Sequence, residues 1–353
     1  MNKARLKESI RLIRQKNLDA LLLTSTSDIF YLSGFNADSG RLIVTASGEA
    51  LFFTNLLYKD AAAADSEWKV FAEKRPQSLQ IADALKKHRV TTLGFDPNAV
   101  TVSEHKSFNE KLNSAKIRLI EAKNLLGGLR SVKSPLELKA IRNALSITME
   151  AAEYAREVAT DTSSEQSLAI EIDRFMRLKG DNTLAFPTIV AGGKNSAFPH
   201  HTPSSQPIGN QALLTDLGAK SHGYCADLTR VSFSGKMPQL FSRVYDIVKK
   251  AQELAIKKVK PGVKCSEVDK AAREFIEKSG YGKYFTHGIG HGVGIEVHEA
   301  PFLNATSQET LREGMVVTVE PGIYLNGRFG IRIEDMVLVR QNKGELLGGN
   351  NEH

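Results

Sequence analysis

The order of predicted elements repeats itself after residue 134, and this repeat constrains the fold more than any other feature of the sequence. In each half, apolar residues at helical spacing indicate two successive helices, and the second helix stops at a glycine before strand-like segments begin. The expected helices span about 136–157 and 165–179, before Gly180, and about 238–259 and 266–279, before Gly280. The expected strands are Phe186–Ala191, Ala212–Leu217 and Tyr224–Phe233, then Val316–Glu320 and Ile331–Val339. A helix-helix-sheet unit present twice predicts a sheet backed by helices, with a cleft between the halves.

The residues before this repeat differ, because short helical and strand-like segments alternate there, as in an α/β domain. Strands are expected at Leu18–Leu23, Arg41–Thr45, Ala50–Thr54, Thr92–Phe95 and Ile117–Ile120, and helices around Leu6–Ile13, Ser78–His88 and Ser103–Leu112. Gly127 and Gly128 interrupt the alternation, and a helix start follows at Ser134–Glu137, with an N-cap, a proline and a capping box. The 353 residues are therefore expected to form two domains, 1–127 and 128–353, in an α+β fold.

Composition narrows the classes of function. Hydrophobic residues make up 41% and charged residues 25% of the chain, as in a soluble globular protein. No apolar run approaches the length of about 18 residues that a membrane helix needs, and the charged start predicts no signal peptide and a cytoplasmic location. Cys225 and Cys265 form no crosslinked framework or metal motif, so both are expected to be buried thiols. The net charge of +7 comes mainly from lysines on helix faces, so no nucleic-acid or membrane partner is expected.

Two aspartates, Asp216 and Asp227, lie on expected strands joined by a turn at Ser221–Gly223. Antiparallel strands bring residues that are distant in sequence opposite each other, so the two carboxylates can meet across this hairpin. Buried like charges repel unless a cation lies between them, which makes the pair a candidate metal site. Aspartates that cap turns at strand ends would give the same pattern, so the hairpin alone leaves both interpretations open.

Three histidines, His287, His291 and His298, follow one another closely in a glycine-rich segment. Glycines this dense let the backbone approach a ligand closely, and three histidines exceed what a core normally holds. Phosphate binding does not fit, because the glycines follow G-x-G-x-G and no G-K-[ST] comes after them. The cluster therefore favours a functional site over a structural one.

Two glutamates complete the set of candidate ligands. Glu320 ends the apolar run Met315–Val319, and Glu334 follows Ile331 and Ile333. Carboxylates in such surroundings are seldom buried unless they are paired or metal-bound, although a surface edge strand would also carry both. Four carboxylates and one imidazole suit two bridged divalent ions such as Mn, Co, Fe or Zn, and the absence of thiolates argues against a structural zinc site.

These clusters resemble the metal-binding motifs of the methionine aminopeptidase, Xaa-Pro aminopeptidase and prolidase superfamily, whose catalytic domain is called the pita-bread fold. The resemblance covers roughly residues 130–340. It rests on five ligands in order, namely Asp216, Asp227, His291, Glu320 and Glu334. The first two are 11 positions apart, the third and fourth 29, and the last two 14, as in the prolidase branch.

The resemblance implies a role for each of these five residues. Asp216 would bind one divalent ion, and Asp227 and Glu334 would bridge two ions. His291 and Glu320 would complete the coordination of the second ion. Ions held in this way lower the pKa of a bound water toward neutrality. Glu320 would also act as the general base, taking the proton and passing it toward the leaving amine.

The same resemblance assigns residues outside the metal shell. His298 would donate a hydrogen bond to the carbonyl oxygen, and His200 and His287 would position the substrate around the proline ring. Arg332 is typical of the proline-specific branch, and we expect Arg332 and Tyr324 to bind substrate.

The segment Ile29–Phe35 is similar to the N-terminal creatinase/prolidase-type domain of the Xaa-Pro branch, which short methionine aminopeptidases lack. The resemblance therefore implies a homodimeric metallopeptidase that cleaves Xaa-Pro bonds at the amino end of short peptides, as a dipeptidase or an aminopeptidase. A basic group near the end of the cleft would favour dipeptides, whose carboxylate it can pair with. A non-catalytic binding protein on this fold, or a creatinase-like amidinohydrolase that works without metal, remains an alternative, and the intact ligand set argues against both.

Overall fold

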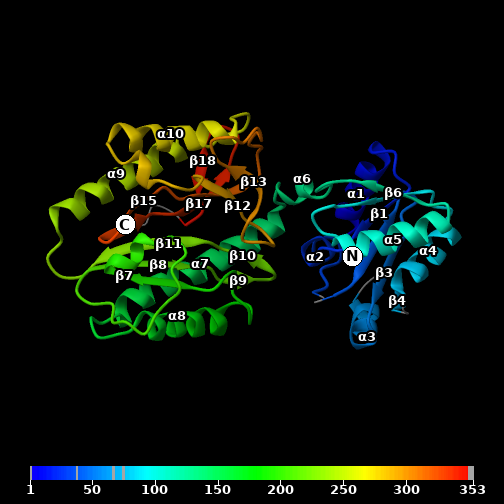
Figure 1. Ribbon diagram of the computed structural model, residues 1–353, viewed down its shortest axis with the longest axis horizontal. Helices are drawn as coiled ribbons and strands as arrows, with labels where there is room; N and C mark the ends of the chain where they lie inside the picture. Colours follow the sequence, from blue (N-terminus) through cyan, green and yellow to red (C-terminus); the bar gives the residue numbers. More distant parts are fainter. Residues whose placement is uncertain (1, 37–38, 66–67, 74–75, 349–353) are drawn as a thin grey trace. The chain divides into compact units, whose positions relative to one another are not determined.

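The computed structural model describes residues 2–36, 39–65, 68–73 and 76–348 (Figure 1). The chain divides into two compact units, Met1–Arg130 and Ser131–His353. In the described part of the chain, no helix combines the length and the hydropathy that crossing a bilayer requires.

The N-terminal unit contains a mixed six-stranded sheet in the order β4-β3-β2-β1-β5-β6. Its strands are β1 (Ala20–Leu23), β2 (Arg41–Thr45), β3 (Ala50–Thr54), β4 (Lys69–Ala72), β5 (Thr92–Phe95) and β6 (Arg118–Glu121). Its helices are α1 (Lys3–Gln15), α2 (Thr26–Ser33), α3 (Leu56–Asp65), α4 (Gln77–Lys87), α5 (Val102–Ser114) and α6 (Gly127–Arg130). The expected α/β alternation is confirmed, whereas α2, α3 and β4 were not predicted. Helix α3 exposes Leu56 and Leu57, so it lacks the apolar stripe that marks a packed helix.

The first half of the C-terminal unit consists of two helices and a three-stranded antiparallel sheet in the order β11-β8-β7. Its elements are α7 (Pro135–Val158), α8 (Glu165–Lys179), β7 (Ile189–Gly192), the 3-10 helix η1 (Gly193–Ala197), β8 (Ala212–Leu217), β9 (Lys220–Ser221), β10 (Tyr224–Cys225) and β11 (Leu228–Phe233). Helix α7 begins with the predicted capping box, since Ser134 and Glu137 exchange side-chain and backbone hydrogen bonds. The turn between β9 and β10 contains His222 and Gly223, both at positive φ, as a tight two-residue hairpin loop requires.

The second half repeats the plan, with a five-stranded sheet in the order β13-β12-β14-β17-β18 and a separate β15-β16 hairpin. Its elements are α9 (Gln239–Ile256), α10 (Cys265–Lys278), the 3-10 helix η2 (Gly282–Tyr284), β12 (Gly290–Gly292), β13 (Glu299–Leu303), β14 (Val316–Val319), β15 (Gly322–Leu325), β16 (Phe329–Arg332), β17 (Asp335–Val339) and β18 (Gly344–Leu346). Within this unit, α9 and α10 lie along one side of the strands and α8 along the opposite side (Figure 1). Each helix pair packs on its own apolar core, so the expected arrangement of helices behind sheet is confirmed.

Two expected strands are broken in the structure. Tyr224–Phe233 divides into β10 and β11, and Asp227 lies between them. Ile331–Val339 divides into β16 and β17, which belong to different sheets, and Glu334 lies between them. Both breaks occur where the backbone exchanges one pairing partner for another, which a pattern of apolar residues does not reveal.

Other sequence expectations are met more closely. Strand β7 starts at Ile189, three positions later than expected, because Phe186–Thr188 pair with no strand in the described residues. The two cysteines are buried free thiols, as predicted, and burial raises the pKa of each to about 12.

Candidate metal centre

The carboxylate-bearing residues of both halves lie where strands end. In the β8-β11 pair, Asp216 is opposite Thr229, so Asp227 lies two residues beyond this partner, just before β11. In the β14-β17 pair, Val319 is opposite Asp335, so Glu320 and Glu334 leave the same end of this pair together. Strand register therefore places two carboxylates side by side in each half.

Backbone contacts between the two sheets bring these pairs together. The backbone N–H of Glu334 donates to the carbonyl oxygen of Thr229 at 3.3 Å. Arg230 donates through Nη1 to the carbonyl oxygen of Glu334 at 2.7 Å and through Nη2 to Asp335 Oδ1 at 2.8 Å. The edge of the first-half sheet is thus joined to the second-half sheet at Glu334.

His291 lies on β12 between two glycines that the packing requires. A Cβ atom on Gly290 would lie 2.1 Å from the carbonyl oxygen of Thr318, and one on Gly292 would lie 2.4 Å from that of Ala300. The glycines therefore allow close approach of neighbouring strands, whereas the sequence pattern had suggested close approach to a ligand.

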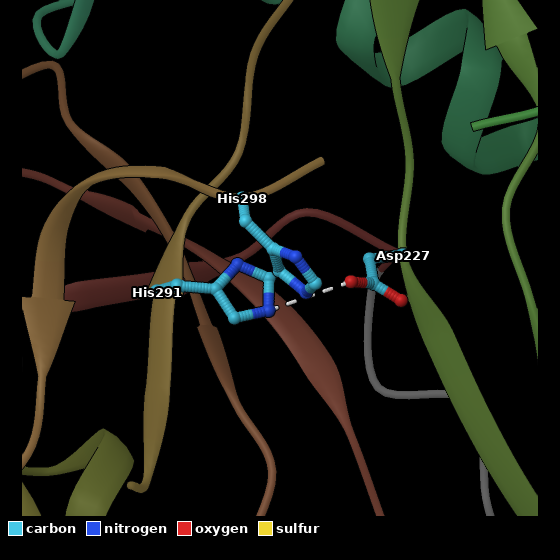
Figure 2. A group of neighbouring side chains, drawn as sticks. All are labelled: Asp227, His291 and His298. Atoms are coloured by element: carbon cyan, nitrogen blue, oxygen red, sulfur yellow. Dashed lines mark ion pairs between the residues drawn. The ribbon is translucent and has the colours of Figure 1, made fainter. Parts of the chain in front are cut away.

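The orientation of the His291 ring leaves its Nε2 atom for a cation. Nδ1 donates to the carbonyl oxygen of Gly292 at 3.2 Å, so in the neutral ring Nε2 carries the lone pair. Nε2 lies 3.2 Å from Glu320 Oε1 and 3.6 Å from Asp227 Oδ2. Figure 2 shows this ring facing Asp227, with the ring of His298 beside it. Electron-rich atoms at these distances need a proton or a cation between them.

All five expected ligands fall into compact groups whose ligating atoms lie within 4.8 Å of one another. The groups are Asp216, Asp227 and Glu334, then His291, Glu320 and Glu334, and thirdly Asp227, His291 and His298. The first two groups contain the five residues, and they share Glu334. The third group brings His298, which was expected to contact substrate, within reach of the same ligands.

Electrostatics indicate a site built for positive charge. Burial, together with the charges of neighbouring carboxylates, raises the pKa of Asp227 and Glu334 well above the ordinary range. Burial also raises the pKa of Asp216, although the Arg332 guanidinium opposes the shift. Burial alone would raise the pKa of Glu320, but the adjacent His291 ring and neighbouring positive charge lower it to about 2.

Two oxygen atoms test directly whether divalent ions fit the site. Asp216 Oδ1 and Glu334 Oε1 are buried and accept no hydrogen bond within the described residues. Buried oxygens are rarely left without a partner, because desolvation costs about 1–3 kcal/mol per group, and more for a charged one. Both atoms belong to the Asp216, Asp227 and Glu334 group, so the donor set fits an ion with oxygen ligands.

Arg332 organises the residues behind this group. Its Nη2 donates to Asp216 Oδ2 at 2.5 Å, its Nε to Thr229 Oγ1 at 2.9 Å and its Nη1 to Tyr324 Oη at 3.1 Å. Thr229 in turn donates to Glu334 Oε2 at 2.7 Å. One guanidinium therefore orients two ligand carboxylates, one directly and one through a hydroxyl.

His287 and Tyr324 extend the same network. Nδ1 of His287 donates to the carbonyl oxygen of Gly288 at 2.8 Å, so Nε2 accepts from the Tyr324 hydroxyl at 2.8 Å. Burial lowers the pKa of His287, in keeping with this neutral form. Both ring nitrogens are therefore bonded to the protein.

The remaining expected residues, His298 and His200, are more exposed. His298 directly precedes β13, and its ring meets that of His291 edge-on, with centroids 4.3 Å apart. Burial and the adjacent His291 ring lower the pKa of His298, and His200 is near enough to add to this effect. His200 belongs to none of the metal groups found in the described residues.

Sequence reasoning did not single out Thr229 or Thr318, although both are fully buried beside the ligands. The hydroxyl of Thr318 accepts from the backbone N–H of His291 at 3.0 Å and donates to Glu320 Oε1 at 3.2 Å. The available signal was weak, because a threonine in a strand is usually explained by β propensity alone.

Two family models cover most of the chain. One, described as metallopeptidase family M24, matches residues 139–341, and one described as the creatinase/prolidase N-terminal domain matches residues 5–132. The chain belongs to metallopeptidase family M24. Peptidases of this family use divalent metal ions, in agreement with the carboxylate and histidine groups of this M24 peptidase.

Relatives of this M24 peptidase match it over nearly their whole length. The Xaa-Pro dipeptidase of Pyrococcus furiosus is 33% identical over 346 residues, which are 98% of this chain and 97% of that protein. The uncharacterized peptidase YqhT of Bacillus subtilis is 34% identical over 338 residues, which are 95% of each chain.

Solved structures agree with the fold. The Xaa-Pro dipeptidase from Bacillus anthracis superposes with a TM-score of 0.93 at 31% identity and covers 99% of both chains. The X-Pro aminopeptidase from Thermotoga maritima superposes with a TM-score of 0.88 at 30% identity and covers 97% of this chain and 99% of that one. The expected pita-bread domain with a creatinase-type N-terminal domain is confirmed.

Proposed function

We propose that this M24 peptidase binds two divalent ions and hydrolyses the Xaa-Pro bond at the amino end of short peptides. The observation that carries the proposal is a pair of ligand groups sharing Glu334, in which Asp216 Oδ1 and Glu334 Oε1 are buried without a hydrogen bond from the described residues. One ion in each of these groups would be held by all five residues, with Glu334 common to both groups and Asp227 also grouped with His291. Oxygen ligands with one imidazole suit Mn, Co, Fe or Zn.

The chain's own residues supply proton transfer and charge stabilisation. Bound divalent ions supply a water acidified toward neutrality. Glu320 takes the proton of the attacking water and passes it to the leaving amine nitrogen. His298, neutral because its pKa is lowered, retains an N–H that donates to the carbonyl oxygen as negative charge develops there.

A network of buried hydrogen bonds around Arg332 positions these catalytic groups. Arg332 and Tyr324 are only 4% and 7% exposed, and the guanidinium bonds reach Asp216, Thr229 and Tyr324. We therefore propose that Arg332 and Tyr324 position the residues that surround the substrate. This role is less direct than the substrate contact expected from sequence. His287 offers its ring surface to the proline, since both its nitrogens are bonded, and His200 contacts the substrate from the loop before β8.

Proline specificity is supported by relatives that are named Xaa-Pro dipeptidase and by the creatinase/prolidase-type N-terminal domain. Structures named dipeptidase and aminopeptidase match about equally well. The fold is therefore compatible with cleavage of dipeptides and of longer peptides. We likewise propose a homodimer, for which light scattering should give twice the 38.8 kDa of one chain.

A single experiment separates this function from its alternatives. The purified protein is stripped of metal with a chelator and then assayed on Ala-Pro with Mn, Co or Zn added in turn. We expect activity to disappear on stripping and to return with at least one metal, at a stoichiometry of two ions per chain. Hydrolysis of Ala-Pro that persists without metal would refute the two-ion mechanism, and metal binding without hydrolysis would indicate a binding protein.

A further inference from the structure

A second buried carboxylate, Glu165, lies outside the metal groups in the first half of the catalytic unit. It is the first residue of α8 and is only 1% exposed. Its Oε1 accepts from the backbone N–H of Gly192 at 2.7 Å and from Asn195 Nδ2 at 2.9 Å. Its Oε2 accepts from His201 Nε2 at 2.8 Å, from the Ser204 hydroxyl at 2.6 Å and from the Ser204 backbone N–H at 3.0 Å.

Five donors around one carboxylate indicate an ionised group that organises its surroundings. Burial alone would raise the pKa of Glu165, but hydrogen bonds from Ser204, Asn195, Gly192 and His201 outweigh it and hold the pKa below the ordinary value. Charge-assisted hydrogen bonds are about twice as strong as neutral ones. All five donors come from residues 192–204, so Glu165 ties this segment to the start of α8.

His200 lies in this segment between two anchored neighbours. Before it, the carbonyl oxygen of Pro199 accepts from Arg332 Nη1 at 3.3 Å, and Arg332 also binds Asp216. After it, the His201 ring is held by Glu165. The exposed His200 side chain is therefore connected on one side to the metal ligands and on the other to a buried anion.

The second half contains an equivalent arrangement. Asp269 on α10 is fully buried and accepts from Arg273 Nε at 2.7 Å and from the backbone N–H of Ile289 at 3.1 Å. Arg273 Nη2 donates in turn to the carbonyl oxygen of His287 at 2.7 Å. In each half, a buried acid on the second helix is thus hydrogen-bonded, directly or through an arginine, to the segment that carries a histidine outside the metal groups.

We propose that Glu165 and His201 are positioning residues that hold His200 against the substrate. The proposal rests on the proposed peptidase function and goes beyond it by giving His201 a role distinct from that of its neighbour. His201 cannot serve as a second substrate contact through Nε2, because this nitrogen donates to Glu165.

We call the pair of Glu165 and His201 the clamp. A double-mutant cycle tests whether this clamp acts through His200. Displacing a contact group by about 1 Å can cost on the order of 100-fold in rate, so His201→Ala should lower kcat/KM on Ala-Pro by 10- to 100-fold with unchanged metal content. In a His200→Ala background the same substitution should have almost no further effect. His201→Gln, which can still donate to Glu165, should recover much of the activity. Losses that multiply in the double variant would overturn the proposal.

Hydrogen exchange tests the clamp without reference to hydrolysis. In Glu165→Gln and His201→Ala, backbone amides of residues 193–204 should lose protection, whereas Glu171→Gln, an exposed change on the same helix, should leave them as in the wild type. Unchanged protection in both variants would overturn the clamp. Loss of protection in a protein that hydrolyses no Xaa-Pro peptide would instead refute the peptidase function and leave the clamp standing as a structural device.

Discussion

Asp227 is buried, has a raised pKa and belongs to two of the three ligand groups, so its charge is the most direct test of the metal site. Asp227→Asn keeps the shape of the side chain but removes its charge. We expect activity to disappear and bound metal to fall, as measured by elemental analysis, while circular dichroism remains unchanged. Asp246→Asn, at an exposed position on α9, is the matched control. Full activity of the Asp227 variant after chelator treatment would refute the two-ion site.

Two neighbouring imidazoles should behave differently when each is removed. His291→Ala should lose metal, because Nε2 of His291 faces two ligand carboxylates. His298→Ala should keep metal and lose kcat by on the order of 10²–10³, as expected for a donor to a developing oxyanion. Because His298 also lies within reach of Asp227 and His291, equal metal loss in both variants would make it a ligand.

Strand β13 is fastened at its first residue by a buried ion pair. Lys133 Nζ donates to Glu299 Oε1 at 2.6 Å, and the two side chains are 1% and 6% exposed. Glu299 directly follows His298, so this pair anchors the strand end that presents the histidine.

Removing the ammonium group should therefore destabilise the fold more than a surface substitution does. Lys133→Met should lower the free energy of unfolding by about 3–5 kcal/mol, because it removes the ammonium group of a buried ion pair. The measurement is urea denaturation, with Lys139→Met as the control. Lys139 is exposed on α7, so the free energy of unfolding of this control should stay within about 0.5 kcal/mol of the wild type. Equal midpoints for the two variants would show that the pair adds no net stability.

Metal should also stabilise the folded protein as a whole. Four carboxylates that repel one another in the chelated protein gain counter-charge when ions bind, and a ligand that binds only the folded state stabilises it by mass action. Chelation should therefore lower Tm, and added Mn should restore it in proportion to the logarithm of its concentration. A Tm that does not respond to metal would contradict a site of this kind.

The proposed proline specificity is tested by comparing three short peptides. The N-terminal domain and the Xaa-Pro relatives predict that kcat/KM for Ala-Pro and Ala-Pro-Ala exceeds that for Met-Ala-Ser by several orders of magnitude. We expect Ala-Pro to be the best of the three. Faster turnover of Ala-Pro-Ala would make the enzyme an aminopeptidase, and fastest turnover of Met-Ala-Ser would overturn proline specificity.

Much of the fold follows from the sequence by itself, because it depends on interactions between residues that are near in the chain. The capping box at Ser134 and Glu137 starts α7 where expected, and Ile141, Leu145 and Thr148 form its buried stripe. The same reasoning locates most strands and both helix pairs. The candidate ligands were also found in this way, since charged residues at apolar strand ends are unusual in any local context.

Only the tertiary structure decides how these residues are used. The breaks at Asp227 and Glu334 follow from an exchange of strand partners, which depends on residues more than 100 positions apart, such as Thr229 and Glu334. Spacing likewise did not reveal that Arg332 is committed to Asp216, or that Glu165 holds His201. The physical reason is that a pattern of apolar residues records which side chains are buried, whereas the contacts of a buried polar group depend on which distant segments the fold brings to it.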